Sequence, residues 1–263
     1  MPRLFLSVDM VGSTLFKATA ASRGSEGWLE TFRMFFTNFP LMLAGQLGFE
    51  FLDEDETPAV DVWKVMGDEV IFTAEPSSAE EVTSILRVLL NTMRLFEANN
   101  YDKLPLRLKG TAWLAEFGTH NIELDIPELS SDDAAPHLDF IGPDLDLGFR
   151  LGKFARPASL ALSLDLVEVL LGAKNLSTIS LYLVGSEELK GVMFGRPYPV
   201  IWMHVADEGF DFMPWEIEGC DWIASVIGVK PTKPAMLRKQ IDDMRLYLHK
   251  MHGIEREPIT FES

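Results

Sequence analysis

The chain has 263 residues, of which 47% are hydrophobic and 24% charged, and its formal net charge is −17. This composition is typical of a globular protein with one large domain, or a domain plus an appendage. The negative charge argues against nucleic acid and anionic membranes as partners, because both are polyanions. The chain has one cysteine, Cys220, which excludes an internal disulfide, so we expect a cytoplasmic protein.

The first notable segment is LFLSVDMVGST, Leu4 to Thr14. Its apolar run predicts a strand from Arg3 to Met10, and Asp9 interrupts that run, so we expect a strand and not a secretion signal. A buried carboxylate without a partner costs several kcal/mol or becomes protonated. We therefore expect a positive charge beside Asp9.

Two helices around a hairpin are predicted next. The first helix contains Pro40, which should kink or break it, because proline lacks the backbone N–H that a helix interior needs. The second helix has two glutamates in its first turn, which suit the positive end of the helix dipole. The predicted elements are a helix at Ser25–Ala44, strands at Val60–Val65 and Val70–Ala74, and a helix at Ala79–Asn99.

The rest of the chain alternates strands and helices irregularly, which predicts an α/β sandwich with a largely antiparallel or mixed sheet. Beyond Val205 the sequence becomes acidic and aromatic and ends in an amphipathic helix. We therefore divide the chain into a domain at residues 1–205 and an appendage at 206–263 that packs on the core or on a partner subunit. The predicted elements are a strand at Leu104–Phe117, an acidic irregular loop at Gly118–His137, a short strand ending at Asp139, a helix from Gly142 to Phe154, strands at Ser159–Ser163, Ser180–Val184 and Pro199–Val205, a helix reaching Gly172, and a last helix at Ala235–His252.

A second carboxylate, Asp68, lies in WKVMGDEVIF at the tip of the predicted hairpin. A hairpin tip projects beyond the sheet, where it can meet Asp9 at the end of a neighbouring strand. Two such carboxylates repel each other, and a divalent cation between them turns this repulsion into attraction. Oxygen ligands suit Mg²⁺ or Mn²⁺. Without a cation, Asp9 would be a helix cap and Asp68 a turn residue.

Two later segments add charged residues. In DFIGPDLDLGFRLGKFA, Asp139 precedes a Gly-Pro turn, and Asp146 and Arg150 follow at helical i, i+4 spacing, which places both on one face. In ELKGVMFGRPYPVIWMHV, Lys190 precedes a glycine and a strand. Taken separately, these residues read as a surface salt bridge and a solvated lysine.

Together and in this order, the four segments resemble the class III nucleotidyl cyclases over roughly Arg3 to Val205. The resemblance implies a ferredoxin-type βαββαβ core with a mostly antiparallel sheet flanked by helices. It also implies cyclisation of a nucleoside triphosphate with release of pyrophosphate. Since in this family the site is shared between subunits, it implies a head-to-tail homodimer with two composite active sites.

The resemblance assigns roles to individual residues. Two Mn²⁺ or Mg²⁺ ions would be held by Asp9, Asp68 and the backbone carbonyl of Met10. The family has Asn where this chain has Asp146, whose role is therefore open. The remaining roles are phosphate binding by the backbone of Val11, Gly12, Ser13 and Thr14, stabilisation of the transition state by Arg150, binding of the terminal phosphates by Lys190, and reading of the base by Lys64 and Asp139.

The base is less constrained. Lysine donates and aspartate accepts, so Lys64 and Asp139 suit adenine, cytosine and uracil alike. The overall form resembles the stand-alone pyrimidine cyclases of bacterial Pycsar anti-phage systems, and a bulky Trp63 or Phe140 would suit a pyrimidine-sized pocket. This implies conversion of UTP to cyclic UMP, a messenger for a separate effector. The alternatives are an adenylate cyclase and an inactive nucleotide-binding module; the charge argues against a polymerase-like palm domain.

Overall fold

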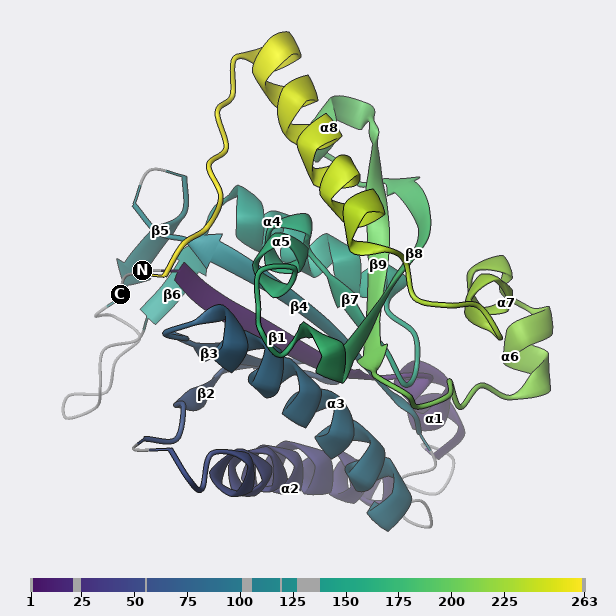
Figure 1. Cartoon of the computed structure of the whole chain (residues 1–263). Coiled ribbons are helices and arrows are strands. Elements are labelled where there is room, and N and C mark those ends of the chain that lie inside the picture. Colours follow the sequence, from purple (N-terminus) through teal and green to yellow (C-terminus); the bar gives the residue numbers. More distant parts are fainter. Residues whose placement is uncertain are drawn as a thin grey trace.

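The structure, a computed structural model, describes residues 2–20, 25–54, 56–100, 106–118, 120–126 and 138–261 (Figure 1). The helices are α1 (Ser13–Ala20), α2 (Ser25–Glu50), α3 (Ala79–Asn100), α4 (Pro143–Leu151), α5 (Leu164–Leu170), α6 (Pro214–Glu218), α7 (Asp221–Val226) and α8 (Pro234–His252). The strands are β1 (Pro2–Met10), β2 (Val60–Met66), β3 (Glu69–Ala74), β4 (Leu108–Glu116), β5 (Ile122–Asp125), β6 (Leu138–Ile141), β7 (Leu160–Leu162), β8 (Ile179–Glu188) and β9 (Pro197–Val205).

The main sheet has seven strands in the order β2-β3-β1-β4-β7-β9-β8. Every neighbouring pair is antiparallel except β4 and β7, which run parallel. The first four strands, with α2 and α3 in the connections, form the βαββαβ unit expected from the sequence. The predicted fold class, a mostly antiparallel sheet flanked by helices, is confirmed.

The two faces of the sheet differ in what covers them. Side chains alternate along a strand, so Leu4, Leu6 and Val8 of β1 join the large core under α2 and α3, which lie over this face in Figure 1. Phe5 points the other way, into a smaller aromatic cluster that includes Leu145 of α4. The polar residues Ser7 and Asp9 share the face of Phe5, so the candidate site lies on the α4 side of the sheet.

Some local predictions were wrong. Helix α2 continues through Pro40, because the buried stripe Phe35, Phe39, Leu43 and Leu47 packs on the core on both sides of the proline. Tertiary packing here outweighs the lost hydrogen bond. The last strand before the Gly-Pro turn does not end at Asp139 but continues to Ile141.

The predicted loop at Gly118–His137 is also partly wrong, since it contains β5, which pairs with β6 in a separate two-stranded sheet. All four residues of β5 are exposed, so burial gives this strand no sequence signal. The remainder of that loop, residues 119 and 127–137, lies outside the described residues, as do Leu104 and Pro105 of the predicted fourth strand.

Residues beyond Val205 pack on the core of the same chain. Arg245 of α8 pairs with Glu168 of α5, and further along Arg256 lies between Asp144 of α4 and Asp165 of α5, with Nη2 2.7 Å from Asp165 Oδ2 and 2.5 Å from Asp144 Oδ1. The two aspartate side chains are buried. The C-terminal segment is therefore fastened beside α4; the boundary at residue 205 stays a prediction.

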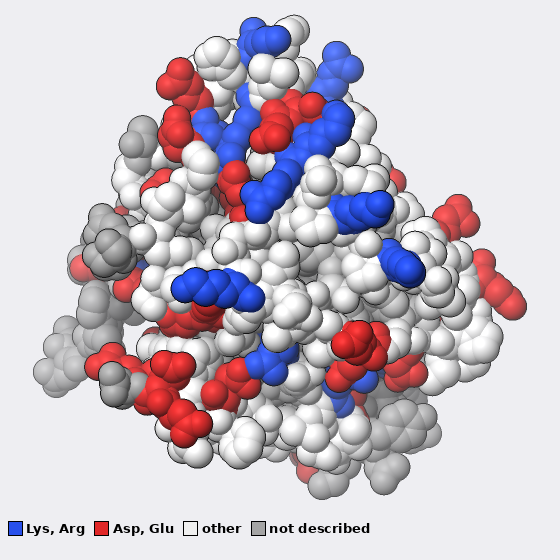
Figure 2. Space-filling view, in the orientation of Figure 1, with Lys and Arg blue, Asp and Glu red and all other residues white. Residues whose placement is uncertain are grey.

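Charge is unevenly distributed over the visible face. Figure 2 shows Lys and Arg side chains gathered in the upper part, over α8, and a group of Asp and Glu side chains at the lower left. Among the described residues, no helix combines the length and the apolar character needed to cross a bilayer.

Candidate active site

Asp9 lies one residue before the end of β1, between two charged neighbours. Its register partners are Glu69 on β3 and Lys109 on β4, so a row of charge crosses three strands. Asp68, at the tip of the β2–β3 hairpin, directly precedes Glu69. Burial raises the pKa of the Asp9 carboxyl above its usual value and the charge of Asp68 raises it further, against the opposing effect of Lys109. The two aspartates that the sequence singled out are thus close enough to repel each other.

The turn after β1 connects to the hairpin tip. Gly12 has φ +81°, a left-handed conformation that suits glycine, and it allows the chain to reverse into α1. Ser13, which is buried, then donates its hydroxyl to the Asp68 carboxylate. The N–H of Val11 donates to the carbonyl of Arg107 at 2.8 Å. Of the predicted phosphate-binding amides, Val11 is therefore engaged within the fold, and Gly12, Ser13 and Thr14 stand at the start of the helix.

A cavity of about 230 Å³ opens beside Asp9. Its floor is formed by the sheet and one side by the end of α4; the lining residues are Ser7, Asp9, Glu69, Lys109, Thr111, Phe149, Gly152 and Lys153. Burial raises the pKa of Glu69, whose carboxylate accepts a hydrogen bond from the Ser7 hydroxyl. The sequence reading missed Glu69 and Lys109, because only the register of β1 with its two neighbours brings them to Asp9.

The predicted base-reading pair forms within one chain. Lys64 Nζ lies 2.6 Å from Asp139 Oδ1, and both side chains are 30% exposed. The pairing of β2 with β3 slips between Val62 and Lys64, which leaves Trp63 as the extra residue of a bulge. Bulges redirect side chains, and here Trp63 and Lys64 both turn toward the α4 side of the sheet. The Lys64 ammonium lies over the Trp63 ring, 3.8 Å from its centroid.

An aromatic cluster stands behind this pair. The Trp63 indole N–H donates to the Leu138 carbonyl at 3.2 Å, which fixes the ring. Trp63 packs edge-on against Phe140, with centroids 5.1 Å apart, and against Phe5 at 5.3 Å. Phe149 of α4 lies 6.2 Å away. The pair Lys64–Asp139 thus faces rigid aromatic walls.

Helix α4 presents the third group of predicted residues. Arg150 Nη1 donates to the backbone carbonyl of Asp146 at 2.6 Å and lies 3.3 Å from its carboxylate. A methyl group on Gly191 would lie 3.9 Å from Arg150 Nη2, so the Lys190–Gly191 turn is beside Arg150. Asp146 therefore pairs with Arg150 on the same face of α4, as the i, i+4 spacing predicts.

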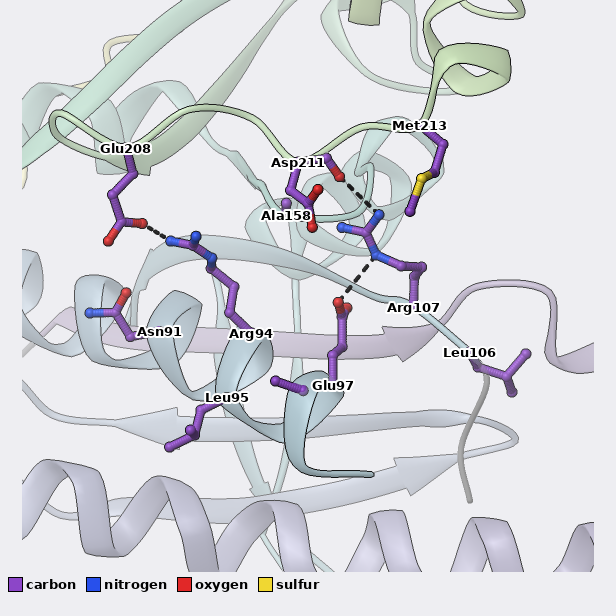
Figure 3. A pocket seen from close by; sticks show the side chains of 11 residues that line it. Asn91, Arg94, Leu95, Glu97, Leu106, Arg107, Ala158, Glu208, Asp211 and Met213 are labelled. Carbon is purple, nitrogen blue, oxygen red and sulfur yellow. Dashed lines mark hydrogen bonds and ion pairs between the residues drawn. The ribbon is translucent and has the colours of Figure 1, made fainter. Parts of the chain in front are cut away.

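A larger cavity lies elsewhere in the described part of the chain. It measures about 720 Å³ and lies between α3, the start of β4 and the segment after β9 (Figure 3). Its two arginines are both engaged, Arg94 with Glu208 and Arg107 with Glu97 and the Asp211 carbonyl. None of the residues predicted for the active site lines this cavity.

The donor set at Asp9 and Asp68 fits hard divalent cations. Two repelling carboxylates and the nearby carbonyl of Met10 supply oxygen only, which is the preference of Mg²⁺ and Mn²⁺. Within the described part of the chain, no group of three or more His, Cys, Asp or Glu residues forms a complete metal site. Water and substrate phosphates would have to complete the coordination, as is usual for Mg²⁺.

The fold is similar to those of several solved structures. No family model and no curated protein matches the sequence. Among solved structures, the adenylyl cyclase CyaB from P. aeruginosa superposes with a TM-score of 0.55 at 14% identity, over 81% of this chain and 97% of that one. The guanylate cyclase domain of RhGC from Catenaria anguillulae, solved with GTP, gives 0.55 at 11% identity, over 78% and 97%. A bacterial light-regulated adenylyl cyclase gives 0.54 at 12% identity, over 84% of this chain and 57% of that one.

The chain therefore has the fold of adenylyl and guanylyl cyclase domains. The superposition covers about four-fifths of the chain, and the neighbouring domain structures are covered almost completely.

Proposed function

We propose that the protein is a nucleotide cyclase that converts a nucleoside triphosphate, UTP by preference, into its 3′,5′-cyclic monophosphate and pyrophosphate. The observation that carries this proposal is the convergence of Asp9 and Asp68, which are far apart in the sequence, at the turn that opens α1. In a cyclase fold this convergence suits a site for the metal-bound triphosphate.

Asp9, Asp68 and the Met10 carbonyl would hold the divalent ions, which when bound promote the 3′-hydroxyl as nucleophile and neutralise the triphosphate. Ser13 keeps the Asp68 carboxylate turned toward the end of β1. The amides of Gly12, Ser13 and Thr14, at a helix start, favour phosphate oxygens through their free N–H groups and the helix dipole.

The bonds exchanged are simple. The ribose 3′-oxygen bonds to the α-phosphorus and its proton passes to water, while the bond from the α-phosphorus to the bridging oxygen breaks and pyrophosphate leaves. Negative charge builds on the phosphoryl oxygens, where Arg150, held by Asp146, supplies a fixed guanidinium. Lys190, in the turn next to Arg150, would bind the terminal phosphates.

Lys64 and Asp139 read the base. They offer one donor and one acceptor, which uracil satisfies through O4 and N3–H. The bulky Trp63 ring, which is held beside them by its hydrogen bond to the Leu138 carbonyl, would suit a pyrimidine better than a purine. Adenine, through N1 and N6–H, also satisfies the pair, so an adenylate cyclase is the second candidate.

A head-to-tail homodimer with two shared sites is part of the proposal. Three apolar side chains near Lys64 and Asp139, on the α4 side of the main sheet or in the elements that cover it, are between 37% and 48% exposed, as expected for a face covered by a partner subunit: Met66, Ile141 and Phe149. The cyclic nucleotide would act as a second messenger on a separate effector in anti-phage defence.

The test is direct. The purified protein is incubated with Mn²⁺ and each of ATP, GTP, CTP and UTP in turn, and products are identified by mass spectrometry. Cyclic UMP as the main product supports the proposal, and cyclic AMP alone assigns the protein to the second candidate. Nucleotide binding without any cyclic product would overturn cyclase activity and leave an inactive binding module.

A further inference from the structure

Lys109 places a fixed positive charge in the middle of the acidic site. Its Nζ lies 3.0 Å from Asp9 Oδ2, and its side chain and that of Asp9 are 23% and 27% exposed. Its backbone is held on both sides, by Asp9 on β1 and by a bridge to Pro157. The ammonium is therefore delivered to Asp9 by the sheet itself and is not a solvent-facing side chain that meets Asp9 by chance.

A second acceptor lies within reach. The same Nζ is 3.3 Å from the carbonyl oxygen of Gly152, directly after the end of α4. If the ammonium leaves Asp9, it can keep this hydrogen bond and stay in the same cavity, which Lys109, Gly152 and Asp9 all line. The side chain therefore has two positions available without being expelled into solvent.

A divalent ion and this ammonium compete for one carboxylate. Lys109 binds one oxygen of the Asp9 carboxylate, so an ion bound to the same carboxylate would lie close to the ammonium, and like charges at such distances repel strongly. Asp68 repels the Asp9 carboxylate, and both aspartates repel the Glu69 carboxylate. Without a metal ion, the Lys109 ammonium offsets this repulsion at Asp9 and at Glu69.

We propose that Lys109 is a built-in competitor for the divalent cation: its ammonium occupies Asp9 in the metal-free protein, moves toward the Gly152 carbonyl when the ion binds, and thereby sets the metal affinity of the site. The inference rests on the metal site of the proposed function. It predicts that metal affinity is limited by a residue that is not a metal ligand.

The test measures Mn²⁺ binding without nucleotide, by the loss of the free-ion electron paramagnetic resonance signal during titration. Lys109→Met should bind Mn²⁺ at least about tenfold more tightly than the wild type, because a repelling charge is removed. Lys109→Arg keeps the charge and should stay near the wild-type affinity. Lys153→Met is the matched control, since Lys153 lines the same cavity but its ammonium lies over the Phe154 ring.

Thermal unfolding gives a second readout. Lys109→Met should melt at a lower temperature than the wild type without metal, because Asp9 loses its counter-charge, and should recover more than the wild type does when Mn²⁺ is added. Equal affinity and equal Mn²⁺-induced stabilisation in Lys109→Met and the wild type would overturn the inference.

The double variant Lys109→Met/Asp9→Asn tests whether the metal ion binds at Asp9 at all. If it loses the tight binding of the single variant, the ion binds at Asp9 and the competition stands. If it binds Mn²⁺ as tightly as Lys109→Met, the ion is not at Asp9, and the metal assignment of the proposed function fails together with the inference.

Discussion

The hydroxyl of Ser13 donates a hydrogen bond to the carboxylate of Asp68, which joins the start of α1 to a hairpin tip 55 positions further along the chain. This contact brings the second acidic residue to the end of β1, where Asp9 lies. The arrangement depends on two turns, and both are visible in the sequence as glycine-containing segments. Substitutions at these and other residues should change activity, base preference and stability in measurable ways.

Asp9→Asn and Asp68→Asn should each lower the rate of cyclic-nucleotide formation by about a hundredfold or more, since each removes a charge that holds the metal ions in the proposed site. The amide keeps the size of the side chain, so the folded state should persist by circular dichroism. Asp61→Asn, exposed on the same hairpin, is the control and should leave the rate unchanged. Full turnover in either site variant would contradict the metal assignment.

Lys64→Met should lower kcat/KM for the preferred nucleotide by about a hundredfold and reduce discrimination among bases, because the hydrogen bond that we propose Lys64 donates to the base would be lost. Steady-state kinetics with all four triphosphates checks this. Lys239→Met breaks another Lys–Asp pair, the exposed one with Asp243 on α8, and should change nothing. Unaltered base preference in Lys64→Met would show that this pair does not read the base.

If Trp63 limits the size of the base as proposed, Trp63→Leu should raise activity toward purine triphosphates relative to UTP by about tenfold, because a bulky side chain is removed from beside the base. The ratio of kcat/KM values for ATP and UTP is the measurement. A ratio that does not move would mean that the aromatic wall does not determine the size of the base accepted.

Arg256→Met should lower the free energy of unfolding by about 3–5 kcal/mol, since it leaves Asp144 and Asp165 buried without their counter-ion. Urea unfolding followed by circular dichroism measures the change. Lys250→Met, on the exposed surface of α8, is the control and should shift stability little. A loss similar to that of the control would show that the C-terminal segment is not fastened by this residue.

His204 should make stability depend on pH. Burial lowers its pKa below the usual 6.5, so as pH falls through 6.5 the unfolded chain takes up a proton that the folded protein does not. The free energy of unfolding should therefore decrease, with a slope of at most about 1.4 kcal/mol per pH unit from this group. His204→Gln should flatten the slope between pH 7 and 5.5, whereas exposed His249→Gln should not. Parallel curves for wild type and His204→Gln would contradict the assignment.

The sequence predicted most of the fold through local signals. The hairpin at Gly67, the helix that opens after Gly142 and the last helix all begin and end close to the expected residues. The irregular alternation of strands and helices also predicted a largely antiparallel or mixed sheet, whereas the βαββαβ order was implied by the family resemblance. These features depend on residues near one another in the chain, which is where sequence patterns are informative.

What could not be predicted depends on distant pairing. Strand β5 has no buried residue, and its partner β6 follows a long intervening segment. Lys109 and Glu69 become part of the site only because β1 aligns them with Asp9. The path of α2 through Pro40 is decided by core packing, which overrides the local preference of proline.

The β2–β3 hairpin carries two of the residues proposed for the active site. A single hairpin carries Lys64 and, just beyond it, Asp68, so it supplies both a proposed base-reading residue and a proposed metal-binding residue. In the proposed head-to-tail dimer these two residues would belong to different nucleotides. The spacing between the two reaction centres would then be fixed by the covalent length of one short ribbon, and inserting or deleting a residue there would silence both centres at once.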